Sequence, residues 1–261
     1  MPERDLALLE EAARAAGKIA LRHFDGARAA TEKPGGQGPV TEADLEIDRM
    51  LRAELTAARP GYGWLSEESE DGTARLAAER VFIVDPIDGT RAFIAGRSAW
   101  GSALAVAERG RVVAGVVHLP RLERTYAAGA GLGARLNGIP IGPSGRADLA
   151  GAQVLATASQ FDALYWPGGV PDVARHFRPA LAYRLCLAAE GRFDATLTFR
   201  DAWEWDVAAG ALIAQEAGAA VSDRSGGALH FNNPVPQVPG VIVAGPRLHA
   251  EILARRSAAS T

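Results

Sequence analysis

The sequence predicts a layered fold of helices and sheets, in which an α+β part is followed by a smaller α/β part. Residues 5–24 and 42–58 carry apolar side chains at helical spacing and predict two amphipathic helices. Short β-type runs follow, and after residues 143–150 strands and helices alternate. We therefore expect an N-terminal α+β part, residues 1–145, with an antiparallel sheet under the two helices, and a C-terminal α/β part, residues 146–261.

The first part contains four predicted strands joined by tight turns. Arg109-Gly110 and Asn137-Gly138 place glycine where hairpin turns favour it. Between the two helices, residues 33–39 are rich in Pro and Gly, which interrupt regular structure, so we expect a mobile loop near the functional site. The predicted strands of this part are 81–84, 100–107, 111–118 and 125–128.

The second part predicts alternating strands and helices without an internal repeat. Its apolar runs differ in length, and short runs favour strands whereas longer periodic ones favour helices. The predicted strands are 153–157, 193–199, 219–221 and 240–243, and the predicted helices are 171–176, 182–190, 207–216 and 246–255.

The bulk composition excludes several classes of protein. The chain has 261 residues, of which 48% are hydrophobic and 23% charged, as is ordinary for a soluble globular protein. The net charge is −3 and no basic run exceeds pairs such as Arg255-Arg256, so we expect no polymeric nucleic-acid partner. No apolar stretch approaches the ~18 residues of a membrane helix, and the first residues are unlike a signal peptide. We expect a cytoplasmic protein without membrane insertion.

Carboxylates in separate parts of the chain are the strongest functional signal. Each follows or opens an apolar segment, where an unpaired charge is costly to bury. No nearby cluster of Lys or Arg neutralises these carboxylates, so we expect a metal cation to lie among the carboxylates. A set of ligands that consists of oxygen atoms alone suits Mg²⁺. The pattern predicts a metal-assisted centre for phosphoryl transfer or hydrolysis. The acidic residues are Asp44, Glu67, Asp85, Asp88 and Asp206.

Asp85 and Asp88 follow a predicted strand and are separated only by Pro86-Ile87. Pro86 should end the strand, and the resulting turn can bring both carboxylates to its carboxyl end. The amides of Gly89 and Thr90 then open a short predicted helix, whose N-terminus can bind phosphate.

Taken one at a time, these acidic residues also have structural explanations. Asp85 and Asp88 suit a turn, Asp206 suits the N-cap of helix 207–216, and Thr41-Glu42-Ala43-Asp44 resembles a capping box. These explanations leave the joint arrangement unexplained.

Other motifs are weaker signals of function. Cys186 and Arg192 have the spacing of cysteine-dependent phosphatases, but the residues between them are apolar and helical, and Glu190 would raise the thiol pKa. We expect Cys186 to be a buried small hydrophobe, and the single cysteine and scattered histidines argue against zinc. Trp166, Trp203 and Trp205 could stack on a base, although Trp more commonly serves in packing.

Four motifs together resemble the inositol monophosphatase superfamily, in order and at similar spacing. They are Gly-Pro-Val-Thr-Glu-Ala-Asp at 38–44, Ser-Glu-Glu-Ser at 66–69, Asp-Pro-Ile-Asp-Gly-Thr at 85–90 and Trp-Asp-Val-Ala-Ala-Gly at 205–210. The third string, followed by the fourth about 120 residues later, is a highly specific signal. The resemblance spans most of the chain and implies alternating α-β-α-β-α layers, with the site between the two parts. It also implies a Mg²⁺-dependent, lithium-sensitive phosphomonoesterase that uses a metal-activated water.

The resemblance further implies the ligands of two or three Mg²⁺ ions. Glu67, Asp85 and the carbonyl of Ile87 would hold the first ion. Asp85, Asp88 and Asp206 would hold the second, and Glu67 would assist a third.

It also implies roles in catalysis and in phosphate binding. Asp44 and Thr90, joined by a hydrogen bond, would orient the attacking water as general base and relay, beside Glu67. The phosphate would lie on the amides of Gly89 and Thr90, next to Asp206.

The substrate is the most specific expectation. The segment 183–191 resembles that of CysQ-type 3′(2′),5′-bisphosphate nucleotidases, in which a basic residue two positions before the Cys lies near the substrate, and Arg184 fills that position. Phe199 stands where animal inositol monophosphatases carry a Glu that binds inositol hydroxyls. We expect adenosine 3′,5′-bisphosphate to be hydrolysed to AMP and phosphate. Inositol-1-phosphate and histidinol phosphate are alternative substrates. A non-catalytic protein that binds a phosphorylated ligand is an alternative function. For assembly, a homodimer is one option.

Overall fold

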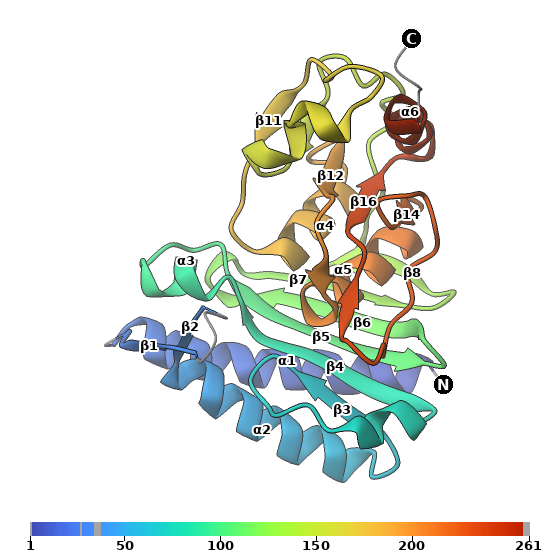
Figure 1. Ribbon diagram of the computed structural model, residues 1–261. Helices are drawn as coiled ribbons and strands as arrows, with labels where there is room; N and C mark the ends of the chain where they lie inside the picture. The colour runs from blue at the N-terminus through green and yellow to red at the C-terminus, as the bar shows by residue number, and fades with distance from the viewer. Residues whose placement is uncertain (1, 27, 34–37, 258–261) are drawn as a thin grey trace.

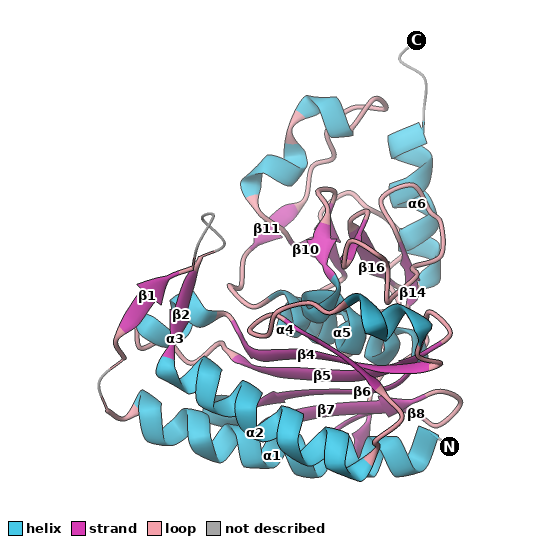
Figure 2. Ribbon diagram, turned by 60° about the horizontal axis from the view of Figure 1, so that its bottom comes forward, coloured by secondary structure: helices cyan, strands magenta, loops and turns pink. Residues whose placement is uncertain are grey.

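The chain stacks its helices and sheets in five alternating layers (Figure 1). The computed structural model describes residues 2–26, 28–33 and 38–257. Helices α1 and α2 lie on one face of a seven-stranded sheet, and α4 and α5 lie on its other face. Beyond α4 and α5 come a five-stranded sheet and then α6 (Figure 2). The predicted α-β-α-β-α order is confirmed.

The first layer is formed by the two predicted amphipathic helices, α1 (Pro2–Phe24) and α2 (Glu42–Ala58). Their apolar faces, which include the fully buried Leu9, Ile47 and Leu51, pack against the large sheet. A two-stranded hairpin, β1 (Ala30–Glu32) and β2 (Pro39–Thr41), connects the two helices.

The seven-stranded sheet has the strand order β3-β4-β5-β6-β7-β8-β9. The predicted hairpin turns are confirmed, since Arg109, Gly110, Asn137 and Gly138 all have the positive φ that such turns require. The strands are β3 (Gly63–Ser66), β4 (Arg80–Asp88), β5 (Gly101–Glu108), β6 (Arg111–Leu119), β7 (Arg124–Gly129), β8 (Gly133–Leu136) and β9 (Ile139–Pro140).

The prediction of an entirely antiparallel sheet is wrong at one edge. Strands β3 and β4 run parallel, because the chain between them crosses over through the short 3-10 helix Thr73–Ala77 instead of a tight hairpin. The other neighbouring pairs of this sheet are antiparallel.

The middle helical layer consists of α4 (Leu181–Ala189) and α5 (Glu204–Glu216), which pack on each other and on the strands of both sheets. The five-stranded sheet has the order β11-β10-β12-β16-β14. Its strands are β10 (Gln153–Leu155), β11 (Ala174–His176), β12 (Ala195–Thr198), β14 (Ala220–Ser222) and β16 (Val241–Ala244). The remaining α-helices and strands are α3 (Thr90–Ile94), α6 (Pro246–Ser257) and the strand pair β13 (Ala202–Trp203) and β15 (Gln237–Val238). Three short 3-10 helices complete the described fold, at Pro120–Leu122, Ala158–Phe161 and Ala163–Tyr165.

The predicted helix over residues 171–176 is wrong. Ala174–His176 form strand β11, which pairs in parallel with β10 at the sheet edge. A segment this short gains too few helical hydrogen bonds to offset the cost of nucleating a helix, whereas the sheet edge satisfies its backbone groups directly.

Some expectations remain predictions from the sequence. They are the division into two parts near residue 145, the cytoplasmic location and the homodimer. The central residues of the predicted Pro/Gly loop, 34–37, lie outside the described part of the chain. Among the helices that the structure describes, none has both the length and the apolar character needed to cross a bilayer.

The close contact between α4 and α5 depends on Gly210. A Cβ atom at this position would lie 2.7 Å from the Cβ of Leu185, which is fixed to the backbone of α4. We expect Gly210→Ala to push the two helices apart and to lower the free energy of unfolding by about 1–3 kcal/mol, as overpacked core variants do. Chemical denaturation would measure this change.

Gly61→Ala is the matched control, because a Cβ there meets no atom within 4 Å. Equal stability of the two variants would contradict the proposed close contact.

Candidate metal and phosphate site

A β-bulge in β4 presents Asp85 and Asp88 at the edge of one cavity. Asp85 pairs with Ala103 of β5, and Asp88 pairs with Gly101. Two residues of β4 lie between these pairs, opposite a single residue of β5, so β4 contains one additional residue. Pro86 lies within this bulge, where its missing N–H does not interrupt the ladder, and its carbonyl accepts a 2.7 Å hydrogen bond from Ser102 Oγ. The prediction that Pro86 ends the strand is therefore wrong, since β4 continues to Asp88.

Most of the predicted site residues line this cavity, which has a volume of about 180 Å³. They come from four different elements: the loop after β3, strand β4, the start of α3 and the first turn of α5. Asp206 belongs to that first turn but is not the N-cap of α5, which is Trp203. The predicted residues that line the cavity are Glu67, Asp85, Ile87, Asp88, Gly89, Thr90 and Asp206.

Glu67, Asp85 and Asp206 form a group that fits a metal ion. Each offers a carboxylate oxygen, and the three oxygens lie within 4.8 Å of one another. Asp85 is 1% exposed, and its Oδ1 atom has no hydrogen-bond partner among the described residues. Burial, followed by the negative charge of Glu67, raises the pKa of Asp85 well above its usual range. A buried carboxylate that has an unpartnered oxygen and lies among other carboxylates needs a cation, and an oxygen-only set suits Mg²⁺.

Asp88 lines the same cavity and also holds α4 in place. Its Oδ1 accepts the amide of Leu181 at 3.1 Å and its Oδ2 accepts that of Ala182 at 2.7 Å. These are free amides at the start of α4, so Asp88 joins β4 to that helix. Burial raises the pKa of Asp88 to about 7, although the two amides act in the opposite direction. Its role as a metal ligand stays a prediction.

The expected pairing of Asp44 with Thr90 is present only as a long contact. Thr90 Oγ1 donates to the carbonyl of Ile87 at 3.0 Å and lies 3.5 Å from Asp44 Oδ1. A hydroxyl has one proton to donate, so the shorter contact to Ile87 is the stronger one.

Asp44 itself forms the predicted capping box with Thr41. Its Oδ2 accepts the Thr41 amide at 2.8 Å and the Thr41 hydroxyl at 2.5 Å. Asp44 is fully buried, and burial raises its pKa to about 6, against the effect of the two hydrogen bonds from Thr41. A pKa close to neutral pH suits a general base. The structural and the catalytic explanations of Asp44 are thus compatible.

Lys33 is a site residue that the sequence analysis missed. Its Nζ lies 2.7 Å from Glu67 Oε1 and 2.7 Å from Glu68 Oε1, and only 9% of its side chain is exposed. Burial lowers the pKa of Lys33, but the two carboxylates outweigh burial and raise it overall. The sequence shows no cluster of basic residues near these acids, but this single lysine neutralises part of the charge of Glu67 and Glu68. Lys33 is far from Glu67 in the sequence, and only the β1–β2 hairpin brings it close.

Arg184 lies on α4 close to the acidic residues. Its side chain is 8% exposed, and within the described residues its Nε has no hydrogen-bond partner. Burial lowers the pKa of Arg184, whereas the charges of Asp88 and Asp206 raise it. Glu190 does not pair with Arg184, because it forms an ion pair with Arg124 at 2.9 Å. Arg184 is thus a buried cation near the carboxylates.

Cys186 behaves as the sequence predicts. It is fully buried on α4, and burial, followed by the charge of Glu190, raises its thiol pKa well above the usual range. A thiol in this state is a poor nucleophile. Trp166 is likewise buried in the core, so it offers no surface for stacking.

Comparison with known proteins agrees with this arrangement. A sequence profile of the inositol monophosphatase family matches residues 1–261. The inositol-1-monophosphatase of Mesorhizobium japonicum is 32% identical over 254 residues, which cover 92% of this chain and 91% of that protein. The histidinol-phosphatase of Chlorobaculum parvum is 32% identical over 228 residues, which cover 85% of this chain and 86% of that protein.

Solved structures are similar as well. The IMPase of Thermotoga maritima superposes with a TM-score of 0.79 at 29% identity, covering 97% of this chain and 96% of its own. The protein suhB of Bartonella henselae superposes with a TM-score of 0.81 at 26% identity, covering 97% and 98%. With its acidic cavity and its five-layered fold, the chain belongs to the inositol monophosphatase family of metal-dependent phosphatases.

Proposed function

We propose that this phosphatase removes the 3′-phosphate of adenosine 3′,5′-bisphosphate and releases AMP. The observation that carries the proposal is Arg184, a buried guanidinium whose Nε lacks a partner among the described residues and whose pKa responds to Asp88 and Asp206. A guanidinium presents a fork of donors that matches a phosphate group, and its charge counts for most where water is excluded. A substrate with a second phosphate would use it.

Two observations argue against inositol-1-phosphate as the preferred substrate. Phe199 is 2% exposed and packs against the ring of Trp166, so this position offers no polar group to a sugar alcohol. The carboxylate of Glu204 is fully buried and accepts hydrogen bonds from the amides of Asn232 and Asn233. Neither residue leaves a free carboxylate for inositol hydroxyls.

In this proposal, Glu67, Asp85, the Ile87 carbonyl, Asp88 and Asp206 hold two or three Mg²⁺ ions. When bound, the ions would supply the positive charge that activates water and stabilises the phosphoryl oxygens, and Li⁺ would inhibit by competing for their sites.

The remaining residues position the reacting groups. Asp44 would accept a proton from the attacking water, with Thr90 as relay. The amides of Gly89 and Thr90 would hold the phosphate. Gly89 has a φ of 94°, and a Cβ there would lie 3.2 Å from the carbonyl oxygen of Ala99, so this close turn favours glycine.

The metal assignment predicts the behaviour of Asp85→Asn. The variant keeps the shape of the side chain but removes the charge, so we expect kcat to fall by more than about 100-fold at saturating Mg²⁺. Without Mg²⁺ its melting temperature should equal or exceed that of the wild type, because a charge buried among other carboxylates has been removed. Phosphate release and thermal unfolding measure the two effects.

The exposed Asp162 provides the matched control for this variant. Asp162→Asn should behave as the wild type. Near-normal turnover of Asp85→Asn would show that the metal assignment is wrong.

The raised pKa values predict how Mg²⁺ stabilisation depends on pH. Burial raises the pKa of Asp44 to about 6 and those of Glu68 and Asp88 to about 7. These pKa values exceed the value near 4 of carboxyl groups in an unfolded chain, so protonation of these groups stabilises the metal-free fold. This contribution to the free energy of unfolding is lost as the pH rises through about 6 to 7. Mg²⁺ would compete with the proton on Asp88, and its charge would disfavour protonation of the neighbouring Asp44 and Glu68. We therefore expect Mg²⁺ to raise the melting temperature much more at about pH 8 than at about pH 5.

Thermal unfolding with Mg²⁺ and with a chelator, at both pH values, tests this expectation. An equal shift in melting temperature at the two pH values would contradict it.

Arg184→Ala tests the choice of substrate. We expect its KM for adenosine 3′,5′-bisphosphate to rise at least about tenfold, while its KM for β-glycerophosphate changes by less than about twofold, because only the first substrate has a second phosphate. Steady-state phosphate release at fixed Mg²⁺, with a parallel Li⁺ titration, provides the measurement. Arg247→Ala, at an exposed position on α6, is the control.

Equal losses on both substrates would reject the role of Arg184. A wild-type preference for inositol-1-phosphate or histidinol phosphate over the bisphosphate would replace the proposed substrate with that ester.

A further inference from the structure

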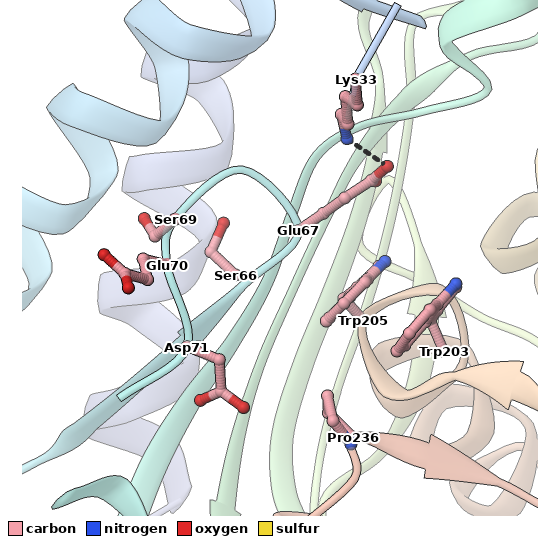
Figure 3. Close-up of a pocket in the computed structure, with 9 residues that line it drawn as sticks. All are labelled: Lys33, Ser66, Glu67, Ser69, Glu70, Asp71, Trp203, Trp205 and Pro236. Carbon is pink, nitrogen blue, oxygen red and sulfur yellow. Dashed lines mark hydrogen bonds and ion pairs between the residues drawn. The ribbon is translucent and has the colours of Figure 1, made fainter. Parts of the chain in front are cut away.

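A second cavity, of about 350 Å³, adjoins the metal site and has no role in the steps proposed above (Figure 3). Glu67 lines both cavities, so the two meet at this side chain. The volume is within the range of pockets that bind small molecules. One wall is the loop 66–71 after β3, and the other includes Trp203, Trp205 and Pro236.

The two indole rings of this cavity are stacked on each other. Their centroids are 4.8 Å apart and their planes differ by only 7°. Figure 3 shows the parallel rings across the pocket from Ser69, Glu70 and Asp71. Trp203 is 37% exposed, which leaves a large aromatic surface accessible. An exposed aromatic pair in a cavity provides a platform on which a planar ring can stack.

Hydrogen bonds hold the loop wall of the cavity in place. Asp48, which is buried on α2, accepts the hydroxyls of Ser66 at 2.5 Å and of Ser69 at 2.6 Å. Glu67 lies between these two serines. The loop is therefore fixed to α2 on both sides of the residue that the two cavities share.

A second set of hydrogen bonds joins the two walls to each other. Buried Arg75 donates to Asp71 at 2.6 and 2.7 Å, to Asn232 Oδ1 at 2.7 Å and to the Asn233 carbonyl at 3.0 Å. The amides of Asn232 and Asn233 in turn donate to Glu204, which lies between the two tryptophans in sequence. The cavity is thus preformed, which lowers the entropic cost of binding a ligand.

The charges around the cavity select the kind of group that it can accept. Asp71 is paired with Arg75 and Glu67 with Lys33, but Glu70 has neither a hydrogen bond nor an ion pair with any residue that the structure describes. A phosphate or carboxylate would be repelled by these acids. An uncharged planar ring could stack on the indoles without such repulsion.

We infer that this cavity binds the planar heteroaromatic ring of the substrate's leaving group, with Trp203 and Trp205 as its stacking platform. The inference rests on the proposed function, in which the ring is adenine. The second phosphate is kept out of this cavity by its carboxylates and is bound by Arg184 instead.

Kinetics on two substrates test the inference. Trp203→Leu should raise the KM for adenosine 3′,5′-bisphosphate at least about fivefold, with kcat little changed, because stacking contributes to binding and not to the chemical step. The KM for β-glycerophosphate, which lacks a ring, should stay within about twofold of the wild-type value. Trp203→Phe, which keeps an aromatic face, should lie between wild type and Trp203→Leu, and it also guards against a loss of folding. Val235→Ala is the control at a nearby position that is 63% exposed.

A binding measurement without metal provides a second readout. Adenosine, which carries no phosphate, should quench the tryptophan fluorescence of the wild type and of Val235→Ala but not that of Trp203→Leu. Equal changes of KM on both substrates, together with equal quenching in all variants, would overturn the inference.

The experiment separates this inference from the proposed function. If the wild type prefers histidinol phosphate to the bisphosphate, the proposed substrate is wrong, yet a Trp203-dependent KM for histidinol phosphate would still support a ring in this cavity. If the bisphosphate is preferred but its KM does not depend on Trp203, the proposed function holds and the inference fails.

Discussion

The buried carboxylate of Asp85 is the constraint on which the rest of the site depends. It is 1% exposed and one of its oxygens lacks a hydrogen-bond partner among the described residues, so its ionised form is unstable unless a cation is bound. The bulge in β4 brings Asp85 and Asp88 to the same cavity, and the loop after β3 and the first turn of α5 add Glu67 and Asp206. The fold therefore concentrates negative charge in one cavity, at the expense of the stability of the metal-free protein.

The site is coupled to the core through the middle helical layer. Asp88 accepts the first amides of α4, and α4 packs on α5, which carries Asp206. Because Gly210 allows the two helices to approach closely, the spacing between Asp88 and Asp206 depends on packing far from the cavity. The placement of these two carboxylates is in this way a consequence of core packing.

Charges of opposite sign are distributed unevenly around the metal cavity. Arg184 supplies a buried positive charge from α4, whereas the cavity beside Trp203 contains carboxylates and aromatic rings. Lys33 contacts Glu67 where the two cavities meet, and the pairing of its ammonium with Glu67 and Glu68 compensates part of the negative charge there. A leaving group that carries both an anion and a planar ring would find a separate environment for each part, which would favour such a substrate over a simple phosphate ester.

Local patterns in the sequence determined much of this protein. Helical spacing placed α1 and α2, the Asn137-Gly138 turn and the β-type runs placed most strands of the large sheet, and the acidic motifs identified the residues that line the metal cavity. These features depend on neighbours in the chain, so the sequence alone carries them. Other features were decided by contacts between distant segments. Ala174–His176 became a strand because an open sheet edge was available, β4 continued past Pro86 because a bulge absorbed it, and Lys33 reached Glu67 because a hairpin folded over the site. Stacking of Trp203 on Trp205 likewise required the walls held by Arg75 and Glu204, since the free energy of such contacts depends on spatial neighbours that the local sequence does not specify.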